Sequence, residues 1–358
     1  MTRSHTIASI PGDGIGQELV AGVSALVETA LRMYGADVAW VHLDWGCDRY
    51  LSNGDFRPAD WVDVLCGTDA IFLGAVGDPR VPDHVSLWNL LLPIRRELRQ
   101  SINLRPVTLL PNVPTPLASK APFDFLIVRE NNEGEYTSVG GSVYENTADE
   151  VVVQSAVFTR HGVQRVARYA FEQARQRRGE VVSATKSNGL PHSMPFWDRV
   201  VADVAAEYPD VHCRQMHIDA LAARVVLAPQ EFDVIVASNL FGDILSDLGA
   251  ALMGGIGLAA SANVNPDGQR PSMFEPVHGS APDIAGRGIA NPVGQILSAV
   301  LMLRHLGEPD AASALAAGLT GALTEASGRT PDIGGNATTE GVLAAVSARL
   351  ATTQQGER

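Results

Sequence analysis

Short apolar runs alternate along the chain with segments in which apolar residues recur at helical spacing. Predicted strands are TIASI (6–10), DAIFLGAV (69–76), DFLIVREN (124–131), EVVVQSAVFTR (150–160), VVSATKS (181–187) and FDVIVASNL (232–240). Predicted helices cover residues 16–35, 88–99, 162–176, 195–209 and 292–307. Buried strands between amphipathic helices are typical of the α/β class.

Two interruptions of this pattern are informative. Residues 255–295 are rich in Gly, Pro, Ser and Asn, so they predict a segment that is mainly loop. A loop of this length inside a compact protein is usually functional. Pro93 lies inside the helical pattern of residues 88–99 and predicts a kink in that helix.

Composition narrows the class of protein. The chain has 358 residues, 46% of them hydrophobic, enough for a substantial core in one large domain or two. Its net charge of −13 argues against a nucleic-acid partner. No apolar run reaches the roughly 18 residues of a membrane span, and the N-terminus does not resemble a signal peptide. Three scattered cysteines, at positions 47, 66 and 213, indicate reduced thiols and a cytoplasmic protein.

The glycines of IPGDGIG (10–16) invite comparison with a dinucleotide-binding fingerprint. That fingerprint has the spacing G-x-G-x-x-G, whereas Gly12, Gly14 and Gly16 bring the third glycine one residue early. The acid expected about 20 residues further on has only ambiguous candidates, Asp37 and Asp44. The motif therefore favours a tight strand-to-helix turn over a standard Rossmann site.

Three acidic residues are candidate metal ligands. Asp243 and Asp247 follow a predicted strand and are four residues apart, so they share one face of a helix. Ligands in α/β proteins gather beyond the carboxyl ends of strands, and oxygen ligands suit Mg²⁺ or Mn²⁺. Asp219 follows a polar segment and is a candidate third ligand. The alternative for this pair is a solvated acidic helix face.

Basic and phenolic residues near strand ends suggest chemistry on a carboxylic acid. The arginines there are candidates because the guanidinium group binds carboxylates bidentately, the alternative for each being a surface charge: Arg95, Arg96, Arg99, Arg105 and Arg129. Lys186 ends a predicted strand, where a lysine is either catalytic or reaches toward solvent. Tyr136 follows another strand in an acidic loop. Together with an acidic metal site, these are the groups that oxidation of a 2-hydroxy acid requires.

At this point the sequence resembles the metal-dependent β-decarboxylating dehydrogenases, the family of isopropylmalate and isocitrate dehydrogenases. The resemblance extends from IPGDGIG to PDIGGNATT (331–339), nearly the whole chain. It is carried by NLRP (103–106), VRENNEGEY (128–136), TKSN (185–188), SNLFGDILSDL (238–248) and EPVHGSAPDIAGRGIANP (275–292). The implied fold is α/β with two domains, isopropylmalate-dehydrogenase-like and not a standard Rossmann fold.

The resemblance also implies a division of labour. Residues 1–104 and 256–358 would form a discontinuous nucleotide-binding domain, and residues 105–255 a dimerisation and metal/substrate domain. Arg95, Arg105 and Arg129 match the substrate clamps, and Asp219, Asp243 and Asp247 match the metal ligands. Lys186 matches the base and Tyr136 the acid that protonates the enolate. In the family, Lys186 and Asp219 reach into the neighbouring subunit's site, which implies a homodimer.

The implied cofactor is NAD. The loop at 275–292 resembles the family's nucleotide loop, with cofactor contacts at His278, Gly279, Ser280, Ala281, Asp283, Ile284 and Asn291. Asp283 matches the acid that accepts the adenosine ribose hydroxyls, and its carboxylate would repel a 2′-phosphate. The choice between Mg²⁺ and Mn²⁺, and a monovalent-cation requirement, stay open.

The substrate is indicated by VPDHVSLWNLLLPIRREL (81–98). Isopropylmalate dehydrogenases usually carry an acid seven residues before the first clamp arginine, where this chain has Trp88, and isocitrate-type enzymes have a serine and an asparagine where this chain has Leu91 and Leu92. VPDHVSLW, LDWGCD (43–48) and VFTRHGVQRVARYAF (157–171) resemble the tartrate and D-malate dehydrogenase branch. Trp88 either closes the pocket around a four-carbon acid or belongs to the core. Alternatives are a 3-isopropylmalate dehydrogenase and, from another class, a catalytically inactive nucleotide-binding regulatory subunit.

Overall fold

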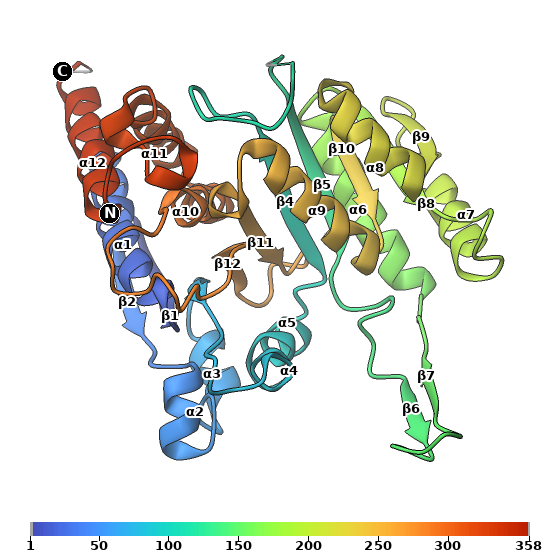
Figure 1. The fold of residues 1–358 in the computed structure, drawn as a ribbon. Helices are drawn as coiled ribbons and strands as arrows, with labels where there is room; N and C mark the ends of the chain where they lie inside the picture. Colours follow the sequence, from blue (N-terminus) through green and yellow to red (C-terminus); the bar gives the residue numbers. More distant parts are fainter. Residues whose placement is uncertain (1–2, 120, 357–358) are drawn as a thin grey trace. The chain divides into compact units, whose positions relative to one another are not determined.

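The computed structural model describes residues 3–119 and 121–356, which form two compact units (Figure 1). The first unit consists of Met1–Gln100, Thr108–Lys120 and Ala250–Arg358, and the second of Ser101–Val107 and Ala121–Gly249. The division expected from the resemblance, at 104/105 and 255/256, concerns functional roles, and those roles stay predictions.

Five strands of the first unit are hydrogen-bonded in the order β2-β1-β3-β12-β11. They are β1 (Arg3–Gly12), β2 (Ala36–His42), β3 (Ala70–Ala75), β11 (Ala260–Val264) and β12 (Ser272–Pro276). β1 is parallel to β2 and β3, β12 is parallel to β3, and β11 is antiparallel to β12. Every residue of β3 is buried, as expected for a strand with both faces covered.

Residues 255–295 are mainly loop, as expected, but two short strands that were not expected, β11 and β12, lie within the segment. Both strands are buried along their whole length. They consist largely of small or polar residues, ASANV and SMFEP, and are bounded by glycine and proline. A short strand that is buried on both faces shows no polar–apolar alternation, so its composition resembles that of a loop.

Helices pack in layers on the first unit's sheet. They are α1 (Ile15–Met33), α2 (Cys47–Asn53), α3 (Trp61–Cys66), α4 (Asp83–Ser86), the π-helical turn η1 (Leu87–Leu91), α5 (Leu92–Glu97), η3 (Ile256–Leu258), α10 (Val293–His305), α11 (Pro309–Ala322), η4 (Ala326–Gly328), η5 (Pro331–Ile333) and α12 (Thr339–Gly356). α1 packs on β1 and β3, α10 packs on β11 and β12, and α11 contacts both α10 and α12. Pro93 lies in the first turn of α5, directly after the π-helical turn, where its missing N–H costs least.

The second unit has its own five strands, in the order β4-β5-β10-β8-β9. They are β4 (Ile102–Thr108), β5 (Asp124–Glu130), β8 (Glu180–Thr185), β9 (His212–His217) and β10 (Val234–Ala237). Its helices are α6 (Arg160–Arg175), α7 (Ser193–Ala205), α8 (Ile218–Leu227), η2 (Pro229–Glu231) and α9 (Asn239–Met253). β10 is parallel to β5 and β8, and α6 packs on all three of these strands.

Two glycines bring α9 close to the strands of the second unit. A Cβ at Gly242 would lie 2.7 Å from Arg129 Cβ, and one at Gly249 would lie 2.6 Å from Val107 Cγ2. Both positions face the sheet, since they are seven residues apart on the helix. The backbone of α9 is therefore held near the ends of β4 and β5, where the candidate catalytic residues lie.

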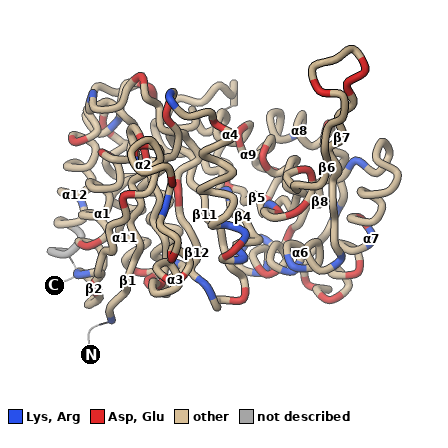
Figure 2. The backbone as a smooth tube through the Cα atoms, turned by 90° about the horizontal axis from the view of Figure 1, so that it is seen from below, with Lys and Arg blue, Asp and Glu red and all other residues tan. Residues whose placement is uncertain are grey.

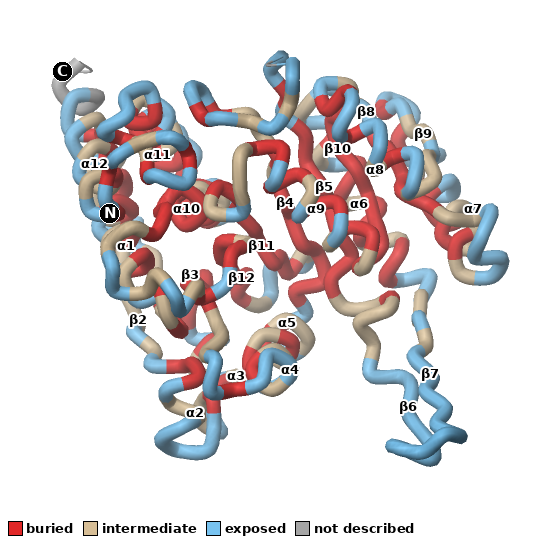
Figure 3. The backbone as a smooth tube through the Cα atoms, in the orientation of Figure 1, coloured by how far each residue is buried: buried red, intermediate tan, exposed pale blue. Residues whose placement is uncertain are grey.

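A separate two-stranded hairpin, β6 (Gly140–Val143) and β7 (Val151–Gln154), also belongs to the second unit. The strand expected over 150–160 is limited to β7, four residues long. Figure 3 shows the hairpin as exposed throughout, and its valines are between 52% and 68% exposed. Its turn contains Glu145, Asp149 and Glu150, and Figure 2 shows the acidic tip.

None of the helices in residues 3–119 and 121–356 combines the length and the hydrophobicity that crossing a lipid bilayer requires.

Candidate active site

The centre of the candidate site is a buried arginine at the end of β5. The Arg129 side chain is 5% exposed, and a guanidinium group in such a place needs acceptors for its N–H donors. Nε and Nη2 of Arg129 donate to Asn239 Oδ1 at 3.1 and 2.7 Å. Nη1 donates to Asp243 Oδ1 and forms an ion pair with it. The two acceptors are four residues apart on α9, so one helix face neutralises the arginine.

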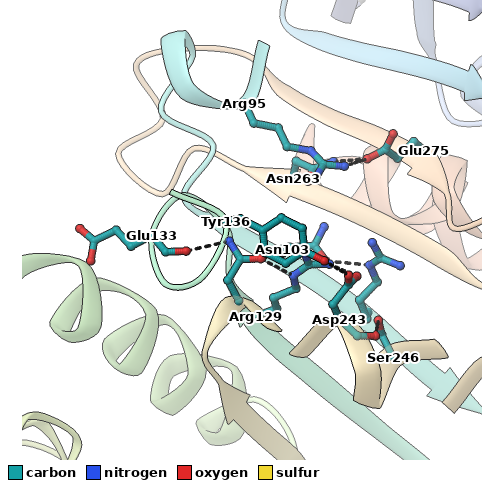
Figure 4. A network of polar contacts seen from close by, with 11 residues as sticks. Arg95, Asn103, Arg129, Glu133, Tyr136, Asp243, Ser246, Asn263 and Glu275 are labelled. Carbon is teal, nitrogen blue, oxygen red and sulfur yellow. Dashed lines mark hydrogen bonds and ion pairs between the residues drawn. The ribbon is translucent and has the colours of Figure 1, made fainter. Parts of the chain in front are cut away.

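Tyr136 joins this cluster from the loop that follows β5. Its hydroxyl donates to Asp243 Oδ2 at 2.6 Å, and Arg129, Tyr136 and Asp243 point toward one another in Figure 4. Burial, and then the hydrogen bond and charge of Asp243, raise the pKa of Tyr136 to about 12. The phenol therefore keeps its proton at neutral pH and is able to act as an acid.

Asp247 lies one helical turn beyond Asp243. Desolvation and the negative charge of Asp243 raise the pKa of Asp247, while Arg105 and Arg129 oppose this shift. A carboxylate whose ionisation is disfavoured, next to a second carboxylate, fits a divalent cation, whose positive charge would stabilise both. Within the described residues, no three or more His, Cys, Asp or Glu side chains form a group that could hold a metal ion. One chain thus does not bring Asp219 together with this pair of acids.

Lys186 and Asp219 instead form a pair of their own. Lys186 follows β8 and Asp219 lies in the first turn of α8, with 2.7 Å between Nζ and Oδ1. The hydrogen bond from Lys186 is the main cause that lowers the pKa of Asp219. The Asp219 side chain is 67% exposed, so this pair lies at the surface of the chain.

The other two predicted clamp arginines are buried and held by polar partners. Arg105 is on β4, where its Nε donates to Asn103 Oδ1 at 2.7 Å. In the first unit, Arg95 Nη2 lies 2.7 Å from Glu275 Oε1, and both side chains are about nine-tenths buried. Asn263 Nδ2 donates to the same Glu275 oxygen at 2.7 Å. Each guanidinium therefore has a fixed orientation.

Within the first unit, the predicted nucleotide loop packs against the glycine turn at the start of α1. Ile15 N donates to Ser280 O at 2.9 Å. Gly14 has a φ of 54°, and a Cβ there would lie 2.1 Å from Ser280 O. Gly14 is therefore required both by its backbone angle and by this close approach. The expected tight turn between a strand and a helix is present, between β1 and α1, and it also contacts the predicted nucleotide loop.

His278 has an unsatisfied buried atom that fits a ligand. Burial lowers the pKa of His278, so the ring is neutral at neutral pH. Its Nδ1 lies 3.0 Å from Gly279 O, and its Nε2 is buried without a hydrogen-bond partner in the described part of the chain. A buried polar atom left in this state is usually satisfied by a ligand or water. This atom therefore supports a binding role for the loop.

The remaining cofactor candidates differ in what their side chains do. Asn291 uses both ends of its amide within the unit, donating to Asp332 Oδ2 at 2.9 Å and accepting from Val293 N at 3.0 Å. Ile284 and Ala281 pack against the cluster that contains Ile15, and Ala281 has a φ of 42°. Gly279 and Asp283 are exposed residues. Of this set, Asp283 is the charged group that solvent and ligands can reach.

The interpretation of Trp88 as core is wrong. Its side chain is 39% exposed, and the Arg96 guanidinium lies 4.9 Å from the centre of its ring. Leu91 is half-buried against the core, and Leu92 is 6% exposed. Trp88 and Leu91 lie in the π-helical turn, which breaks the 3.6-residue period, so helical spacing could not tell which side chains are buried.

Three polar residues that support the candidate site were missed in the sequence. Asn239 accepts a hydrogen bond from Arg129, and Glu275 accepts one from Arg95. Both lie inside the quoted family blocks, at or near strand ends. Glu130 directly follows Arg129 and is 2% exposed. Its carboxylate accepts from the N–H groups of Asn132 and Glu133 at 3.0 and 2.8 Å, which shapes the start of the Tyr136 loop. A polar residue at the end of a buried strand was the available signal.

Comparison with known proteins gives the class of this fold and site. The chain belongs to the isocitrate/isopropylmalate dehydrogenase family, because residues 6–347 match the sequence model of that family. The crystal structure of isocitrate dehydrogenase from Methylococcus capsulatus superposes with a TM-score of 0.87 at 34% identity, covering 97% of this chain and 99% of that one. The expected fold class is thereby confirmed.

Two curated relatives narrow the class. D-malate dehydrogenase [decarboxylating] of Escherichia coli K12 is 52% identical over 355 residues, covering 97% of this chain and 98% of the relative. Tartrate dehydrogenase/decarboxylase of Pseudomonas putida is 50% identical over 360 residues, covering 98% of each. The resemblance to this branch is confirmed, and the chain is an enzyme of the decarboxylating dehydrogenase class.

Glu130 should make stability depend on pH. Burial raises the pKa of Glu130 from 4.5 to about 7. Between these values the folded chain binds more protons than the unfolded chain, so the free energy of unfolding falls as pH rises. In the wild type, this titration should lower the free energy of unfolding by up to about 3 kcal/mol between pH 5 and pH 8. Glu130→Gln removes the titrating group and should abolish this decrease. Urea unfolding at both pH values measures it.

The matched control is Glu340→Gln, which changes an exposed acid in the first turn of α12. This variant should keep the wild-type pH dependence. If Glu130→Gln also kept it, the Glu130 carboxyl would not titrate in this range.

Proposed function

We propose that this enzyme oxidises and decarboxylates a short 2-hydroxy dicarboxylic acid, D-malate or tartrate, using NAD⁺ and Mg²⁺ or Mn²⁺. The observation that carries the proposal is the cluster of Arg129, Asp243 and Tyr136, with Asp247 beside it. The cluster brings together a guanidinium group that can bind a carboxylate, two carboxylates that can bind a divalent metal ion, and a protonated phenol. The curated relatives named above support the same reaction.

The residues have distinct roles in the proposed reaction. Arg95, Arg105 and Arg129 bind the substrate carboxylates, and Asp243 and Asp247 hold the cation with Asp219 of a second copy. The cation, when bound, polarises the 2-hydroxyl and stabilises negative charge on that oxygen. The loop at 275–292, with Asp283, would hold NAD⁺, which would supply the acceptor for the hydride that leaves C2.

Proton transfers are assigned to two side chains. Lys186 of the second copy takes the hydroxyl proton as hydride leaves C2, which gives a 2-oxo acid. The β-carboxylate then leaves as CO₂, and the electron pair of the broken C–C bond forms an enolate. Tyr136 donates its proton to C3 of that enolate, which its raised pKa allows at neutral pH. D-malate yields pyruvate, CO₂ and NADH.

A second copy of the chain is part of the proposal. Lys186 pairs with Asp219, whose side chain is 67% exposed, and within the described residues Asp219 does not join Asp243 and Asp247 in one group of metal ligands. Exposed apolar side chains also mark the second unit, including Leu227 at 75%, Ile244 at 55% and Val152 at 68%. Such side chains on α8, α9 and the hairpin favour burial against another molecule. A homodimer with shared sites accounts for both features.

Substrate choice is the first test. With NAD⁺ and Mn²⁺, the purified enzyme should form NADH from D-malate with a higher kcat/KM than from 3-isopropylmalate, tartrate isomers and isocitrate being measured alongside. Trp88→Ala should reduce the preference in kcat/KM for D-malate over 3-isopropylmalate by about 1–3 kcal/mol, since it opens space for the isopropyl group. A wild-type preference for isopropylmalate would overturn the proposed branch of substrates. Absence of NADH from every acid would indicate an inactive subunit.

Cofactor choice is the second test. NAD⁺ should give at least about tenfold higher kcat/KM than NADP⁺, because like charges about 4 Å apart near a surface repel by about 1–4 kcal/mol. Asp283→Asn should reduce this ratio, whereas Asp310→Asn, an exposed acid in the first turn of α11, should leave it unchanged. Equal use of both cofactors by the wild type would refute the role of Asp283.

Complementation tests the shared site. Lys186→Ala and Tyr136→Phe subunits, each inactive alone, should regain partial activity when refolded together, because one site of a mixed dimer receives both intact residues. Differently tagged subunits verify that mixed dimers form. Mixed dimers that stay inactive would show that each site is built from one chain.

A further inference from the structure

Asn239 has a buried side-chain amide that contacts two elements at once. It is the first residue of α9 and is 2% exposed. Its Oδ1 accepts from Nε and Nη2 of Arg129, and its Nδ2 donates to Glu133 O at 3.1 Å. Figure 4 labels the two partners of this amide, Arg129 and Glu133. Both the acceptor and the donor ends of the amide are therefore occupied.

The Glu133 carbonyl belongs to the loop that carries Tyr136. At its far side the loop is fastened by the Glu133 carboxylate, which accepts from Thr159 N and Oγ1 at 2.8 and 2.5 Å. Gly134 exchanges two backbone hydrogen bonds with Val157. Those contacts attach the loop to the start of α6. Asn239 attaches it to Arg129 and to the helix that carries Asp243.

An amide suits this position better than a carboxylate would. As a neutral acceptor, Asn239 satisfies two donors of Arg129 and adds no second negative charge to that of Asp243, so the cluster does not gain a net negative charge that would repel a substrate carboxylate. Its Nδ2 also provides a donor toward Glu133 O, where a carboxylate oxygen would face another acceptor. Accepting from Arg129 and donating to Glu133 O both depend on the amide group and not on the size of the side chain.

We propose that Asn239 is a positioning residue that orients Arg129 for substrate binding and holds the Tyr136 loop at the distance at which Tyr136 reaches Asp243. The inference rests on the proposed function, in which Arg129 binds the substrate carboxylate and Tyr136 is the acid. It adds a residue that touches neither the reacting atoms nor the cation and yet links carboxylate binding to placement of the acid.

Asn239→Asp is the discriminating variant, because it keeps the size of the side chain and an acceptor for Arg129. It should raise the KM for D-malate and lower kcat, each by at least about tenfold, the scale of a lost or neutralised charged contact. Asn239→Ala should also lower kcat and raise KM. Asn265→Asp is the matched control, since Asn265 is equally buried and its Nδ2 donates to Leu98 O at 2.9 Å. It should lower the melting temperature with little effect on kcat or KM.

Amide hydrogen exchange provides a readout that does not require turnover. In Asn239→Asp, residues 131–139 should exchange at least about tenfold faster, while β5 and α6 keep their wild-type rates. Unchanged exchange in this loop, or kinetics that match Asn265→Asp, would overturn the positioning role. If the wild type turned over no hydroxy acid, the proposed function would fail, and the exchange comparison would still decide the role of Asn239 in holding the loop.

Discussion

The second unit is organised around the burial of one positive charge, the guanidinium of Arg129. Removing such a charge from water costs several kcal/mol unless its donors are satisfied and its charge is balanced. Asp243 and Asn239 meet this requirement from one face of α9, and Gly242 between them lets the helix approach. The position of α9 relative to β5 follows from that need.

The same arrangement sets the chemistry available to the site. Asp243 accepts hydrogen bonds from both Arg129 and Tyr136, so one carboxylate links the proposed cation site with the proposed acid. Burial raises the pKa of Tyr136 further above neutral pH and brings the pKa of Glu130 close to it. Groups that a surface would hold in their ordinary ionisation states are therefore shifted by their surroundings, which is common where catalysis is performed.

Much of the core could be predicted, because short continuous apolar runs such as β3 and β10 are stable only as strands that are buried on both faces. The acids of α9 were also identifiable, since Asp243 and Asp247 follow a buried strand at helical spacing. β11 and β12 were not, because small residues buried on both faces carry no alternation. Trp88 was ambiguous because a π-helical turn alters the helical period.

Partnerships were harder to predict than positions. Arg129 could be selected from its place at a strand end, but its contact with Asn239 joins residues that are 110 positions apart in the sequence. Nothing in local spacing reveals which acceptor a buried guanidinium will use. For the same reason, the pairing of Lys186 with Asp219 depends on how β8 and α8 pack, which no periodicity encodes.

In the proposed homodimer, the order of the β6–β7 hairpin would depend on dilution. A two-stranded ribbon is at best marginally stable in water, and this one leaves its valines exposed. Association that covers such a ribbon makes its order a function of protein concentration. Protease cleavage in the turn between β6 and β7 would then report self-association, with the rate rising as the enzyme is diluted while the rest of the fold stays intact.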